Sequence, residues 1–65
     1  MDEKQVLSIS DAVKFLAISK ATLYRYRMND SSFPKSIHLT KRKIVYRIGD
    51  LIKWIDKKAE ETNAD

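Results

Sequence analysis

The sequence predicts a small, mainly α-helical domain that carries one β-hairpin. Apolar residues recur at helical spacing in residues 11–16, 20–28 and 48–61. Between the second and third of these segments, residues 37–40 and 44–47 are rich in β-branched and aromatic side chains, which favour strands. The expected order is therefore two helices, a two-stranded hairpin and a third helix.

A short connection joins the first two predicted helices. Ser10 and Ser19 are the expected N-caps, because a serine hydroxyl accepts a hydrogen bond from a free backbone N–H in the first turn. Ala17 stands where such turns often hold glycine, since one residue there has a positive φ. Two helices, a tight turn and a capped second helix predict a helix-turn-helix. Residues 6–9, before the first helix, are expected to be extended.

The segment after the second helix predicts a bend and then the hairpin. Phe33 precedes Pro34, which restricts Phe33 to extended geometry, and its ring is expected in the core. The hairpin tip carries three consecutive cations, Lys41, Arg42 and Lys43. Because this tip contains no Gly or Asn, a longer loop built on a type I turn is expected.

The third predicted helix has an apolar stripe formed by Ile48, Leu51, Ile52, Ile55 and Ala59. Trp54 is adjacent to the stripe and is expected to close the core. A helix-turn-helix followed by a two-stranded wing and a further helix is a winged helix-turn-helix. We expect one such domain over residues 6–61, with flexible termini at residues 1–5 and 62–65.

Composition argues against several classes of function. The 65-residue chain has no Cys and one His, which excludes disulfides and thiolate–metal sites and disfavours a His-based metal cluster. Gly49 is the only glycine, so a glycine-rich phosphate loop is absent. We expect neither catalysis nor a cofactor. No apolar run approaches about 18 residues and the N-terminus does not resemble a signal peptide, so a cytoplasmic, nucleoid-associated protein without membrane contact is expected.

Charge is unevenly distributed along the chain. The formal net charge is +4, from 13 Lys and Arg against 9 Asp and Glu. Between residues 20 and 47, eight cationic residues accompany a single acidic one, Asp30, whereas acidic residues concentrate at the two ends. A basic middle with acidic ends predicts a face that binds a polyanion, with simple solubilisation as the alternative.

The second helix is the candidate recognition helix for double-stranded DNA, with the wing tip near the neighbouring backbone. Leu23 and Tyr26 are expected to anchor this helix in the core. Its predicted groove-facing residues are Lys20, Thr22, Tyr24 and Arg25, and Arg25 is the candidate for a bidentate guanine contact. The predicted phosphate contacts are Arg27, Lys41, Arg42, Lys43 and Arg47. For Arg47, a bond to the acidic end of the third helix is the alternative.

Four groups of residues stand out in the predicted elements: residues 18–25 (Ile-Ser-Lys-Ala-Thr-Leu-Tyr-Arg), 33–35 (Phe-Pro-Lys), 45–47 (Val-Tyr-Arg) and 50–55 (Asp-Leu-Ile-Lys-Trp-Ile). In their order and spacing they resemble the AlpA family of small phage and prophage regulators, which are relatives of MerR-like DNA-binding domains and excisionases. The resemblance implies a winged helix-turn-helix, sequence-specific DNA binding, and a role in transcription control or excisive recombination. It also places Ser19 on the recognition helix and Arg47 after the second wing strand. Many members have Gly in the wing turn and before Phe-Pro, where this chain has Lys41-Arg42 and Ser31-Ser32.

The leading hypothesis is a transcriptional regulator or recombination directionality factor of a prophage or genomic island. Integrase or RNA polymerase is the expected protein partner. Cooperative binding by neighbouring copies is expected, because one small domain contacts little DNA. The alternative hypothesis is a protein-interaction adaptor or antitoxin-like inhibitor whose basic face binds an acidic partner. An RNA-binding module is less favoured, because the predicted sheet lacks exposed aromatic side chains.

Overall fold

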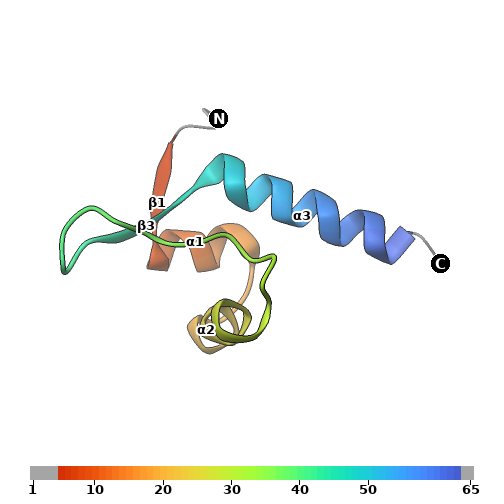
Figure 1. Ribbon diagram of the computed structural model, residues 1–65, viewed down its shortest axis with the longest axis horizontal. Helices are drawn as coiled ribbons and strands as arrows, with labels where there is room; N and C mark the ends of the chain where they lie inside the picture. The colour runs from red at the N-terminus through yellow and green to blue at the C-terminus, as the bar shows by residue number, and fades with distance from the viewer. Residues whose placement is uncertain (1–4, 64–65) are drawn as a thin grey trace.

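The computed structural model describes residues 5–63, which form three α-helices and three β-strands (Figure 1). In chain order the elements are β1 (Val6–Ser8), α1 (Ile9–Leu16), α2 (Lys20–Asn29), β2 (Ile37–His38), β3 (Ile44–Arg47) and α3 (Ile48–Asn63). The winged helix-turn-helix class is therefore confirmed. Residues 1–4 and 64–65, which the sequence assigned to flexible termini, lie outside the described residues.

The sheet has one strand more than the predicted hairpin. Its strands are antiparallel in the order β1-β3-β2, so β3 lies in the middle. Val6 of β1 pairs with Arg47 of β3. The carbonyl of Gln5 accepts a hydrogen bond from the Ile48 N–H at 2.9 Å, which extends this contact to the start of α3. The added strand connects the wing to the helix-turn-helix, because α1 begins directly after β1.

The wing tip is closed by Thr40 and by the backbone. The Leu39 N–H donates to the Lys43 carbonyl at 2.9 Å. The Thr40 hydroxyl accepts hydrogen bonds from the N–H groups of Arg42, at 3.2 Å, and Lys43, at 3.0 Å. The first wing strand ends at His38, two residues earlier than the sequence predicts, because Thr40 bonds within the loop instead of to a neighbouring strand.

Helix α1 begins two residues earlier than predicted, and its N-cap is Ser8 instead of Ser10. The Ser8 hydroxyl accepts a hydrogen bond from the Asp11 N–H at 3.1 Å. Ser8 is the last residue of β1 and has extended dihedral angles, which is the geometry of an N-cap. Ser10 already lies inside the helix, so its assignment as the cap was wrong.

The turn between α1 and α2 has the predicted form. Ala17 adopts the left-handed region with φ of 58° and ψ of 43°, and its N–H donates to the Lys14 carbonyl at 3.2 Å. The Ser19 hydroxyl caps α2 by accepting a hydrogen bond from the Thr22 N–H at 3.1 Å. Both predictions are confirmed, and the turn fixes the angle at which α2 leaves α1.

The core is centred on aromatic rings. Its buried cluster consists of Ala12, Leu23, Phe33, Tyr46 and Leu51. The Phe33 ring meets Trp54 and Tyr46 edge-on, with centroids 5.0 and 5.8 Å away, and stacks on Tyr26 at 6.0 Å. Phe33 is buried and Trp54 packs against the cluster, as the sequence predicts. These rings connect α2, β3 and α3.

Only the first part of α3 buries its apolar stripe. Ile48 and Leu51 are fully buried, but Ile55 is 37% exposed and Ala59 is exposed. The last two residues of the predicted stripe are therefore not buried, because α3 extends beyond the other helices (Figure 1). The helix also continues to Asn63, two residues beyond its predicted end.

Asp30 links the end of α2 to α3. Its carboxylate accepts hydrogen bonds from the Ser32 hydroxyl and from the Ser32 N–H, and it pairs with the Lys58 ammonium at 3.1 Å. The bonds from Ser32, together with Lys58, hold the pKa of the Asp30 carboxyl well below its usual range. The bond to Asp30 in turn raises the pKa of Lys58. This group of three residues secures the loop that follows α2.

We predict that Ala17→Gly stabilises the protein by about 0.5–1 kcal/mol. Glycine adopts the left-handed region without the steric cost of a Cβ. This gain in the folded state exceeds the destabilisation caused by the larger conformational entropy of glycine in the unfolded chain. Urea unfolding followed by circular dichroism measures the change. Ala59→Gly, in the exposed part of α3, is the matched control and gives no stabilisation. A destabilised Ala17→Gly variant would contradict the left-handed assignment.

We predict that Asp30→Asn flattens the dependence of stability on acid pH. Because the folded-state pKa of Asp30 is lowered, its charge stabilises the fold above the unfolded-state pKa of about 4, and this stability is lost as the pH falls below that value. Asparagine keeps an oxygen acceptor for Ser32 but has no charge to lose. Thermal melts between neutral and strongly acid pH measure the effect, and an unchanged slope would contradict it.

Candidate nucleic-acid interface

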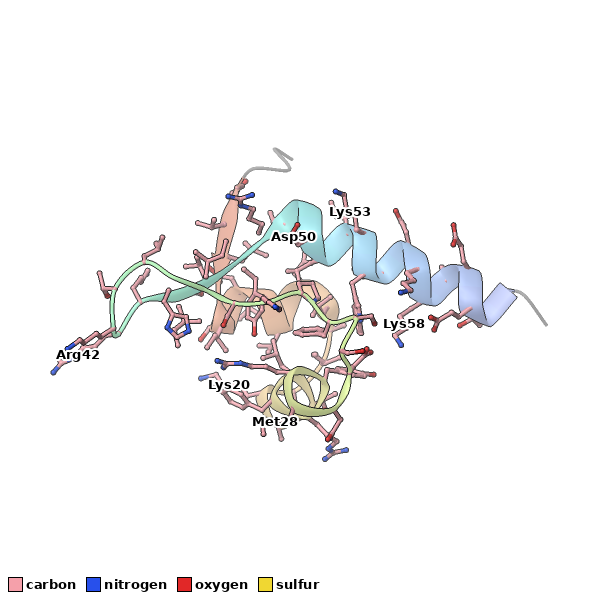
Figure 2. All side chains as sticks on the ribbon, viewed as in Figure 1. Lys20, Met28, Arg42, Asp50, Lys53 and Lys58 are labelled. Atoms are coloured by element: carbon pink, nitrogen blue, oxygen red, sulfur yellow. The ribbon has the colours of Figure 1, made fainter. Side chains whose placement is uncertain are left out.

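One face of α2 is buried and the opposite face is open. Leu23 is fully buried and Tyr26 contacts the rings of Phe33 and Trp54, as predicted for the two anchors. Figure 2 shows Met28 at the outer edge of α2, on the side turned away from α1 and α3. The outward face of α2 is therefore available to a partner over its whole length.

The predicted contact residues of α2 lie on two flanks of this outward face. At about 100° per residue, Lys20, Tyr24 and Arg27 fall on one flank, whereas Thr22 and Arg25 fall on the other. Figure 2 shows Lys20 on the side of α2 that faces the hairpin. Thr22 and Arg25 instead line a surface hollow beside the loop that follows α2. The structure thus separates the predicted set into a wing-side group and an opposite group.

Arg27 lies near the buried hydroxyl of Tyr46. Burial raises the pKa of the Tyr46 hydroxyl, and the positive charge of Arg27 opposes this shift. Arg27 itself is exposed and lines a second hollow with Lys35 and Ser36, at the loop before β2. Its guanidinium is thus positioned between α2 and the wing, where the sequence predicted a phosphate contact from the flank of the helix.

Ser19 and Thr22 have a structural role at the start of α2. Their hydroxyls are hydrogen-bonded to each other at 2.9 Å, in addition to the capping bond between the Ser19 hydroxyl and the Thr22 N–H. Ser19 is exposed and Thr22 is half-buried. A contact of either hydroxyl with DNA stays a prediction, and it has to coexist with the cap.

The wing tip is cationic and exposed. Lys41, Arg42 and Lys43 are all exposed, and Figure 2 shows Arg42 at the far end of the hairpin. In the same view, Lys20 and Arg42 both lie on the side of the molecule away from the C-terminal end of α3.

Arg47 lies at the other end of β3 from the wing tip. Its side chain is exposed, opposite Val6 of β1. Within residues 5–63 it forms no ion pair, because the ion pairs found there are those of Lys58 with Asp30 and Glu61. The alternative bond of Arg47 to the acidic end of α3 is therefore not formed among these residues.

The far side of the molecule provides a matched reference surface. Figure 2 shows Lys53 pointing away from α2, on the opposite side of α3. Lys53 is exposed like the wing cations, but it lies on the side of α3 that is turned away from α2. A variant of Lys53 therefore changes the net charge without changing the candidate interface.

Sequence reasoning missed the most exposed apolar residues of this surface. Met28 is 82% exposed and Leu39, at the start of the wing loop, is 57% exposed. The helical wheel contained the signal for Met28, because its position is opposite to that of Leu23 and Tyr26. In the described part of the chain, no group of three or more candidate ligands is placed to hold a metal ion. Nor does any helix there have the length and apolar character needed to cross a bilayer.

The architecture and this surface define a small winged helix-turn-helix protein. The family model described as prophage CP4-57 regulatory protein (AlpA) matches residues 5–59. The chain therefore belongs to the AlpA family of prophage regulatory proteins, as its sequence motifs indicate. No curated protein and no solved structure matches the chain.

Proposed function

We propose that this protein binds double-stranded DNA, with α2 in the major groove and the tip of the β2–β3 hairpin against the adjacent phosphate backbone. The observation that carries the proposal is that Lys20 of α2 and the exposed cations of the wing tip lie on the same side of the molecule (Figure 2). Two segments far apart in the sequence thus supply positive charge to one surface. Membership of a prophage regulatory family supports the same conclusion.

The dimensions of α2 suit a major groove. Its 10 residues span about 15 Å, and a major groove about 12 Å wide admits an α-helix. The outward face of α2 contains Ala21 and Tyr24 but no acidic side chain, so the phosphates on either side of the groove are not repelled. Arg25 and Lys20 approach the groove from opposite flanks of the helix.

The biological role that we propose is control of transcription or of excisive recombination in a prophage. Both roles place the protein on DNA in the cytoplasm, with RNA polymerase or integrase as its protein partner. A single domain of this size buries little DNA, so neighbouring copies are expected to bind cooperatively to adjacent sites. The competing function is an adaptor whose basic face binds an acidic protein. Gel-shift titration with duplex DNA at two salt concentrations separates the two, because the basic face of an adaptor gives only weak, sequence-independent binding to duplex DNA, which is lost at the higher salt concentration.

We predict that replacing Lys41, Arg42 and Lys43 together by Ala weakens binding to all duplexes alike. Each lost phosphate contact reduces the slope of log K against log salt concentration by about 0.9, because fewer counterions are released on binding. Fluorescence anisotropy over a salt series measures the slope. Lys53→Ala is the control, and it leaves the slope close to that of the wild type. Equal slopes for the triple variant and the wild type would remove the wing from the interface.

We predict a different result for Arg25→Ala. Loss of a bidentate contact to a base costs about 1–3 kcal/mol on the specific site and relaxes base preference at one position. The specific site is first selected from a random duplex library, and competition between this site and random duplex then measures specificity. If the variant loses affinity for both duplexes in the same proportion, Arg25 is a phosphate contact and not a base contact.

A further inference from the structure

We infer that Ala21, Tyr24 and Met28 form an apolar strip that recognises thymine through its C5-methyl group in the major groove. This inference rests on the proposed DNA binding and adds a specificity determinant to it. The strip is defined by these three side chains, with Ala21 and Met28 on the outward face of α2 and Tyr24 at its wing-side edge. Neither Ala21 nor Met28 is among the cationic and polar residues from which the interface was predicted.

The exposure of the strip is the first observation. Met28 is 82% exposed and Tyr24 is 44% exposed, while Ala21 is also exposed. Leu23 and Tyr26 already provide the core contacts of α2, so the strip is not needed for packing. A surface helix usually has polar residues on its solvent face, and α2 has apolar groups on both faces.

Helical spacing aligns the three side chains. Ala21, Tyr24 and Met28 stand at positions i, i+3 and i+7, so they follow one line along the helix. With a rise of about 1.5 Å per residue, the line extends over about 10 Å, which corresponds to about three base-pair steps of 3.4 Å. The strip therefore matches a short run of neighbouring bases.

The side chains around the strip indicate which chemical group it binds. Lys20 and Arg25 flank the strip on its two sides, and the described residues of its outward face include no acid. A groove with apolar groups at its floor and phosphates on both walls complements this pattern. In the major groove, the apolar group is the C5-methyl of thymine. An unbranched, polarisable Met side chain adapts to such a contact, and Ala21 allows the backbone to approach closely.

Replacement of thymine by deoxyuridine tests the inference, because it removes only the methyl group. On the selected site, single substitutions at contacted thymines weaken wild-type binding about three- to fourfold, the effect of exposing one buried methyl group. At one or more of these positions, the Met28→Gln variant binds duplexes with thymine and with deoxyuridine equally tightly. Met28→Leu, which keeps an apolar side chain, retains the wild-type sensitivity. Gln and Leu are both good helix formers, and Met28 is exposed, so neither change unfolds the protein.

Leu39→Gln is the matched control, since it removes an exposed apolar side chain from the wing loop instead of from α2. It keeps the wild-type ratio of affinities for thymine and deoxyuridine. Specific binding with no sensitivity to deoxyuridine at any position overturns the inference and leaves the proposed function standing. Failure to bind any duplex at low salt overturns both. If Met28→Gln instead weakens association between copies, with an unchanged ratio, the strip contacts a second copy and the inference is wrong.

Discussion

The contact of Phe33 with the rings of Tyr26 and Trp54 determines how α2 is presented. Phe33 follows α2 in the chain, and its ring contacts a residue of α2 and a residue of α3, whose rings also contact each other. Aromatic rings bury a large area and prefer defined mutual orientations, so this cluster fixes the rotation of α2 about its own axis as well as its position. With Leu23 and Tyr26 turned inward, Ala21 and Met28 are necessarily turned outward, and Tyr24 lies at the wing-side edge of the same face. The surface that α2 offers is therefore a consequence of the core.

The same packing separates the charges. Asp30 is the one acidic residue between residues 20 and 47, and it directly follows α2. Its carboxylate is bound by Ser32 and by Lys58 of α3, so its negative charge is compensated locally. A free carboxylate at this point would repel the phosphates that the neighbouring cations attract. The ion pair thus contributes to the electrostatics of the candidate interface as well as to the loop.

Local patterns in the sequence correctly predicted the features that depend only on neighbouring residues. The Ser19 cap, the left-handed Ala17 and the buried Phe33 each depend on a few adjacent residues, and each was predicted. The Ser8 cap was not, because Ser8 and Ser10 satisfy the same pattern and only the pairing of β1 with the distant β3 distinguishes them. The apolar stripe of α3 was predicted as far as Ala59, but Ile55 and Ala59 are exposed, because periodicity describes the face of a helix and not the point at which its neighbours end. For the candidate site, the cations were evident from composition. Met28 was not among the predicted contacts, although the helical wheel places it opposite Leu23 and Tyr26, because those contacts were chosen for charge and hydrogen bonding.

The third strand bears directly on binding. In a two-stranded wing, the hairpin would be attached to the domain only through its two ends, and its tip would reorient on contact with DNA. Here β3 lies between β2 and β1, and β1 leads without interruption into α1. The hydrogen bond from the Ile48 N–H to the Gln5 carbonyl extends the attachment to α3. The wing and α2 are thus held by one framework, and a surface that is already arranged loses less conformational entropy when it binds. Because the area of contact is limited in so small a domain, its affinity depends on this smaller loss of conformational entropy.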